Sequence, residues 1–155
     1  MIWIIFPIYL IFIFLFIILF SYLHELGRQR ELDKVGIPSK IKFHILDNIK
    51  KTFKEVHPFA TISFDEKKFN RLNKIKKTKI LLAGIKIDLI IITILMIVIL
   101  IFYFLLFLEK NINLFYMGFF SILLLITQII KFYYNLFTEN SDIGKLKKLV
   151  NNQRI

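Results

Sequence analysis

Three long runs of apolar residues without a charged side chain interrupt a sequence that is otherwise polar and basic. They cover residues 2–20, 89–108 and 114–130, which is 19, 20 and 17 residues. A helix rises about 1.5 Å per residue, so each run spans about 26–30 Å, close to the thickness of a bilayer's hydrocarbon layer. Each run therefore predicts a transmembrane helix.

The pattern as a whole predicts an all-α membrane protein with one domain over residues 1–155. We expect three transmembrane helices, at about 2–24, 80–108 and 114–137. The first run lacks a basic segment before it and a small-residue cleavage site after it. We therefore expect it to remain a permanent span rather than a cleaved signal peptide.

The segment between the first two spans predicts a small strand and amphipathic element. Within residues 37–46, apolar Ile41, Phe43 and Ile45 alternate with polar residues, which is the period of a half-buried strand. Residues 47–56 have apolar positions at helical spacing, which indicates a short amphipathic helix. Residues 63–66 read Ser-x-x-Glu, the spacing of a helix capping box, and apolar residues at helical spacing follow toward the second span. We expect a re-entrant or interfacial layer here.

Composition and charge narrow the class of protein. The chain has 57% hydrophobic residues, above the usual 45–50% or so of soluble domains, and a mean hydropathy of +0.65. It has no cysteine, which excludes disulfides, iron–sulfur clusters, thiolate zinc sites and cysteine nucleophiles.

The net charge of +11 is concentrated beside the spans. Residues 27–79 hold 15 Lys and Arg against six acids, and the tail at 138–155 is also basic. The positive-inside rule then predicts that the N-terminus lies outside and that the loop 27–79 and the tail are cytoplasmic. This placement favours the lipid bilayer over nucleic acid as the partner of the basic residues.

Candidate chemistry begins at the end of the first span, in the segment HELGR. Residues four apart share a helix face, so two histidines in H-E-x-x-H hold one zinc ion beside a glutamate base. Here His24 and Glu25 are present, but position 28 is Arg, which has no lone pair for a metal. A simpler interpretation of this fragment is a helix end, with Gly27 past the last turn and Arg28 among lipid headgroups.

HELGR and three later segments together resemble the site-2 protease family of intramembrane zinc metalloproteases. Residues 24–28 are similar to the family's HELGH on the first core helix, and residues 35–37 to its glycine-containing step into an edge strand. Residues 83–85 read Ala-Gly-Ile where the next core helix has Ala-Gly-Pro, and Asp88 stands where an Asn follows. Residues 135–144 are similar to its Asn-Leu-x-Pro and Asp-Gly segment, without the proline and with Ile143 after Asp142.

This resemblance covers residues 15–150 and implies roles for three residues. His24 and Asp142 match zinc ligands, and Glu25 matches the general base of metal-assisted peptide hydrolysis. Because a catalytic zinc normally has three protein ligands and a water, the resemblance implies a degenerate metal site here. The loop also contains His44, expected on the solvent side of the strand, and His57, expected in a turn before Pro58.

Polar residues inside the spans give a second set of candidates. Asp88 requires a partner within the membrane, and Arg28 is the natural one. A stripe of polar residues recurs every seven positions on the third span, if the helix persists: Ser121, Gln128, Asn135 and Asp142. This stripe suits either a reaction site or a polar seam between helices.

The sequence therefore leaves two functions open, and with them the question of whether the protein is an enzyme. One is an intramembrane metallopeptidase that uses zinc on a membrane-anchored peptide or protein. The other is a non-catalytic membrane protein of accessory, peptide-binding or immunity type, with no metal and with Arg28 paired to Asp88 or Asp142. If HELGR were accidental, the ends of the first and third spans would lie far apart.

Overall fold

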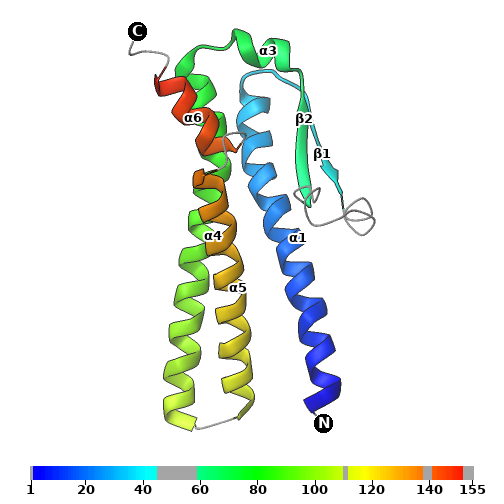
Figure 1. The fold of residues 1–155 in the computed structure, drawn as a ribbon, viewed down its shortest axis with the longest axis vertical. Helices are drawn as coiled ribbons and strands as arrows, with labels where there is room; N and C mark the ends of the chain where they lie inside the picture. Colours follow the sequence, from blue (N-terminus) through cyan, green and yellow to red (C-terminus); the bar gives the residue numbers. More distant parts are fainter. Residues whose placement is uncertain (1, 45–58, 110–111, 138–140, 152–155) are drawn as a thin grey trace.

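Three long helices form the body of the molecule, which we describe from a computed structural model covering residues 2–44, 59–109, 112–137 and 141–151. They are α1 (Ile2–Lys34), α4 (Lys74–Glu109) and α5 (Ile112–Phe137). All three are long and apolar enough to cross a membrane. They lie side by side, with α5 returning antiparallel to α4 (Figure 1).

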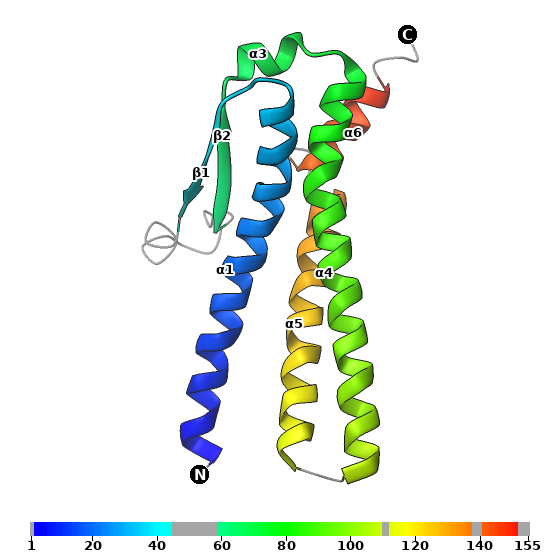
Figure 2. The same cartoon turned by 180° about the vertical axis from the view of Figure 1, so that it is seen from behind.

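Four short elements gather at one end of these helices. They are β1 (Ser39–Phe43), β2 (Ala60–Phe64), α3 (Glu66–Arg71) and α6 (Asp142–Asn151). The two views place α6 beside the first half of α4 and the strands beside α1 (Figures 1 and 2). The expected fold class, three apolar helices with a small strand element between the first two, is confirmed.

The helix α1 continues well past its apolar run and ends at a glycine cap. Gly36 has a φ of +75°, a left-handed conformation that glycine adopts without steric cost. The amide of Ile37 donates to the carbonyl of Leu32 at 3.0 Å, as in a Schellman-type helix end. The interpretation of Gly27 as the helix end is therefore wrong, because Gly27 lies inside α1.

Strand β1 pairs antiparallel with β2, with Ile41 opposite Ile62. The strand expected within residues 37–46 is confirmed as β1, whereas the sequence pattern did not reveal β2. The expected capping box is wrong, since Ser63 belongs to β2 and extended backbone continues to Phe64. Asp65 caps α3 instead, and its side chain accepts from the amides of Lys67 and Lys68. The helix expected at 47–56 lies outside the described residues.

Two apolar clusters hold the helices together at different levels. Inside the spans, Phe20 of α1, Ile91 and Leu95 of α4, and Leu124 of α5 are buried against one another. Beyond the spans, Leu32 of α1, Ile37 and Ile80 form a second cluster under β2 and α3. The second cluster attaches the short elements to the helices.

The β-hairpin lies along α1 and reaches its membrane-spanning part. Phe59 at the start of β2 meets Phe14 edge-on with ring centroids 5.4 Å apart, and Phe43 stacks on Tyr22 at 5.7 Å. Phe14 lies six residues, or about 9 Å, inside the first apolar run. The hairpin therefore lies beside the end of the first apolar run.

Replacing Leu32 by Ala tests the second cluster. Leu32 has no exposed surface, so truncation leaves a cavity, and we expect a loss of about 2–5 kcal/mol in unfolding free energy. Thermal unfolding in detergent, followed by circular dichroism, measures it. Leu10→Ala is the matched control, since Leu10 is 49% exposed on α1 and its truncation leaves no cavity. Equal effects of the two substitutions would contradict this assignment of the core.

Candidate functional site

Six ionisable side chains from four helices meet where the apolar runs end, and we call them the charge network. They come from α1 (His24, Glu25, Arg28), α4 (Asp88), α5 (Lys131) and α6 (Asp142). Asp88 directly precedes the second run and Lys131 directly follows the third. The charge network therefore lies at one boundary of the apolar layer formed by the three spans.

His24 links two carboxylates on different helices. Its Nδ1 lies 2.8 Å from Oδ2 of Asp88, and its Nε2 lies 3.2 Å from Oδ2 of Asp142. An ionised carboxylate only accepts hydrogen bonds, and a neutral imidazole has one N–H. Both hydrogen bonds therefore form together only when the ring carries a proton on each nitrogen.

Arg28 pairs with Glu25 and also with Asp142, which it shares with His24. Its Nη1 donates to both oxygens of Glu25, at 3.0 and 3.4 Å, and lies 3.5 Å from Oδ1 of Asp142. Arg28 and Glu25 are one helical turn apart, so α1 alone brings them together. The contact to Asp142 attaches α6 to α1.

Asp88 is the most deeply buried member of the charge network, with 1% of its surface exposed. A carboxylate so far from water is costly unless other charges and hydrogen bonds compensate. His24 contacts its Oδ2, and Nζ of Lys131 donates to its Oδ1 at 3.0 Å. Asp88 therefore joins α1, α4 and α5 through its two oxygens.

The charges of the network balance when the imidazole is protonated. Three carboxylates then face the guanidinium of Arg28, the ammonium of Lys131 and the imidazolium of His24. Such balance is what allows ionised groups to remain buried beside an apolar layer.

Asp142, which lies outside the spans, shows how strongly these charges act. Burial alone disfavours its ionised form and is the largest single influence. The hydrogen bond from His24 and the positive charges of Arg28, His24 and Lys145 together outweigh it and hold the pKa of Asp142 below its usual range.

Two glycines allow α1 and α4 to approach closely enough for these contacts. A Cβ at Gly84 would lie 2.5 Å from Nε2 of His24, so only glycine leaves room for the ring. A Cβ at Gly27 would lie 2.8 Å from Ile87 and 3.1 Å from the carbonyl of Ala83. The Ala-Gly pair at 83–84 thus has a direct packing role beside His24.

The structure brings His24, Glu25 and Asp142 together. These are the three residues for which the resemblance implied roles. The proposed pairing of Arg28 with Asp142 is present. The pairing of Arg28 with Asp88 is wrong, because His24 and Lys131 occupy both oxygens of Asp88. The sequence analysis did not identify Lys131 as part of this site. Its place at the edge of an apolar run was the available signal, because a lysine there requires a carboxylate nearby.

The polar stripe on the third span is present in part. Ser121 and Gln128 are buried on α5, but α5 ends at Phe137 and Asp142 begins a separate helix. The condition for a continuous stripe, one helix through residue 142, is therefore not met, and Asp142 contacts His24 from the separate helix α6. The side chain of Asn135 lies outside the described part of the chain.

The loop histidines do not add to the site in the described residues. His44 lies beside β1, and its Nε2 is 2.8 Å from the hydroxyl of Thr61 on β2, so it has a protein partner in place of the expected solvent. His57 lies outside the described residues. Neither supplies a described ligand near His24.

The residues present do not fit a catalytic zinc ion. Within the described ranges, no group of three or more His, Cys, Asp or Glu side chains is arranged to hold a metal. Arg28 adds a fixed positive charge beside both Glu25 and Asp142, where it would repel a divalent cation. Only His24 and Asp142 remain of the ligand set that the resemblance implies.

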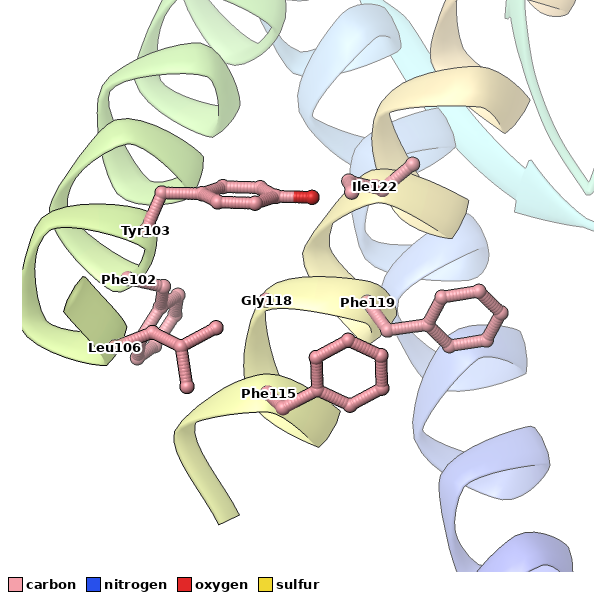
Figure 3. A pocket seen from close by; sticks show the side chains of 7 residues that line it. All are labelled: Phe102, Tyr103, Leu106, Phe115, Gly118, Phe119 and Ile122. Atoms are coloured by element: carbon pink, nitrogen blue, oxygen red, sulfur yellow. The ribbon is translucent and has the colours of Figure 1, made fainter. Parts of the chain in front are cut away.

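A shallow apolar groove between α4 and α5 lies near their connection, at the end away from the charge network. Figure 3 shows it lined by aromatic rings, among them Phe102, Phe115 and Phe119, with the hydroxyl of Tyr103 pointing across it. It contains no charged side chain. The chemistry of the described chain is therefore at the opposite end.

Comparison of the chain with models of known protein families, with curated proteins and with solved structures found no match.

Replacing Gly84 by Ala tests the packing of His24. The new Cβ would overlap the imidazole, so we expect the ring to leave Asp88 or Asp142 and the apparent Tm in detergent to fall by several degrees. Gly118→Ala is the control on α5, since its Cβ would meet Phe102 at an ordinary 3.6 Å. An unchanged Tm for Gly84→Ala would disprove the close approach.

Replacing Arg28 by Met tests the ion pairs. Glu25 and Asp142 would lose a buried positive partner, which typically costs about 3–5 kcal/mol. Arg30→Met removes the same charge from an exposed position on α1 and should change stability little. Chemical unfolding in detergent compares the two variants. Greater stability of Arg28→Met than of the wild type would show that the pairs do not hold α6 to α1.

Proposed function

We propose that this chain is an integral membrane protein resembling the core of the site-2 proteases, in which the metal site is degenerate and the protein acts by binding. It would be a non-catalytic protein of accessory, peptide-binding or immunity type. Its partner would be a membrane-anchored peptide or protein that reaches the charge network within or beside the bilayer.

The observation that carries this proposal is the position of Arg28. In a zinc peptidase the glutamate must be free to accept a proton from a metal-bound water. Here one guanidinium nitrogen engages both oxygens of Glu25 and approaches Asp142 as well. A fixed cation therefore fulfils the charge-balancing role of a metal, but it cannot coordinate a water and lower the pKa of that water as a catalytic metal does.

A binding role is further supported by buried polar atoms that lack a partner among the described residues. In the bundle these are Nε of Arg28, a donor, and Oε1 of Gln128, an acceptor. Unsatisfied groups of this kind are costly beside an apolar layer. Neither atom has exposed surface, so a peptide, whose peptide groups carry both an N–H and a C=O, would satisfy them only after the helices around them move apart.

The basic residues beside the spans support one orientation. Under the positive-inside rule the charge network, the hairpin, α3 and α6 would face the cytoplasm, and the N-terminus would lie outside. The partner's reacting or bound segment would then be presented at the cytoplasmic boundary of the membrane.

A second candidate, metal-dependent peptide hydrolysis, is favoured by one feature of His24. A metal-ligating histidine commonly donates its second nitrogen to a carboxylate, as Nδ1 of His24 does to Asp88. Its Nε2 then faces Asp142, the other residue matched to a zinc ligand.

Metal content separates the two candidates. We expect wild-type protein, purified with zinc present, to contain far less than one zinc per chain by mass spectrometry of the metal. We expect Arg28→His to gain zinc, because it removes the cation and supplies a third ligand at the i+4 position.

Two controls complete this experiment. Zinc gained by Arg28→His should be lost again in His24→Ala/Arg28→His, which removes a matched ligand. Stoichiometric zinc in the wild type, lost in His24→Ala, together with cleavage of a membrane-anchored peptide that stops in Glu25→Gln, would overturn the binding proposal in favour of hydrolysis.

A further inference from the structure

The exposed side of α4 beside the charge network carries three lysines, which we call the lysine stripe: Lys76, Lys79 and Lys86. Lys79 and Lys86 are seven positions apart and lie within about 20° of each other around the helix, and Lys76 lies about one turn before Lys79. All three are exposed, whereas Gly84 and Asp88, roughly opposite Lys79 and Lys86, are buried. The lysine stripe therefore faces away from the bundle.

The lysine stripe differs in its pairing from the two cations of the charge network and from Lys77. Arg28 and Lys131 are held by carboxylates, and Lys77 donates to the carbonyl of Asn70. Within the described residues, the structure gives no ion pair or hydrogen bond to the ammonium of Lys76, Lys79 or Lys86. Their charge is available to a ligand from outside the chain.

The lysine stripe begins near the boundary of the apolar layer and continues along α4 away from that layer. Lys86 lies three residues, about 4.5 Å, before the apolar run that begins at Leu89. The headgroup region is roughly 5–8 Å deep on each side of the hydrocarbon, so a bilayer whose hydrocarbon begins at Leu89 would place Lys86 among the lipid phosphates. Lys79 and Lys76 lie about 15 and 20 Å from the same boundary, so they extend the positive potential outward and attract anions to Lys86.

From this juxtaposition we propose that the lysine stripe, centred on Lys86, binds the phosphate headgroup of an anionic phospholipid. Ordinary surface lysines on α3 have the same charge but lie at the far end of the molecule from the apolar runs (Figure 1). Within the described residues, the stripe combines exposed ammonium groups that have no ion pair with a position beside an apolar run. This site is independent of the role proposed for the charge network.

The test compares lipid binding in nanodiscs of neutral phosphatidylcholine with and without phosphatidylglycerol. We expect phosphatidylglycerol to raise the apparent Tm of the wild type and to co-purify with it in native mass spectrometry. Lys86→Gln should weaken retention of phosphatidylglycerol about fivefold, the effect of one lysine at a membrane surface. Lys79→Gln/Lys86→Gln should abolish the rise in Tm.

The matched control is Lys67→Gln/Lys68→Gln, which removes two exposed charges from α3. It should keep the response to phosphatidylglycerol. If it loses as much as Lys79→Gln/Lys86→Gln, net charge alone acts and the site is disproved. If inorganic phosphate stabilises the protein equally in neutral nanodiscs, through Lys86, the ligand is a free anion and the lipid assignment is overturned.

Discussion

The structure depends on keeping six ionisable groups together at the edge of an apolar layer. Each of the three spans ends at this level with a charged or ionisable side chain, and none of these groups could remain there alone. His24 and Lys131 each form a hydrogen bond with one oxygen of Asp88. Arg28 balances the charges of Glu25 and Asp142. The cost of an unpaired charge therefore fixes how the helices meet.

Close packing of α1 on α4 makes these contacts possible. Gly27 and Gly84 remove the side chains that would separate the two helices, and the ring of His24 fills the space beside Gly84. Beyond the charge network, the cluster around Leu32 attaches the hairpin and α3, and Asp142 attaches α6. The short elements thus lie at the end of the bundle that carries the buried charges of the described residues.

The proposed function follows from the identity of the cation beside Glu25 and Asp142, which is the guanidinium of Arg28 and not a metal ion. A zinc peptidase needs an exchangeable position for water, whereas a guanidinium is permanently protonated and fixed by its own hydrogen bonds. Arg28 is therefore compatible with a stable scaffold and a binding role, while His24 and Asp142 lie in hydrogen-bonding contact with each other. The lysine stripe would add a contact with the lipid itself.

The sequence by itself determined the three spans, strand β1, and the candidates His24, Glu25, Arg28 and Asp142, since long apolar runs and i, i+4 spacing are local properties of a chain. It could not determine which charges pair. From the sequence, Arg28 was expected to pair with Asp88 or Asp142, and Lys131 was not expected to take part in the site. Only the tertiary structure decided these pairings. The rotation and depth of each helix depend on the close packing at Gly27 and Gly84 and on the break between α5 and α6. The periodicity of a single helix contains no information about either.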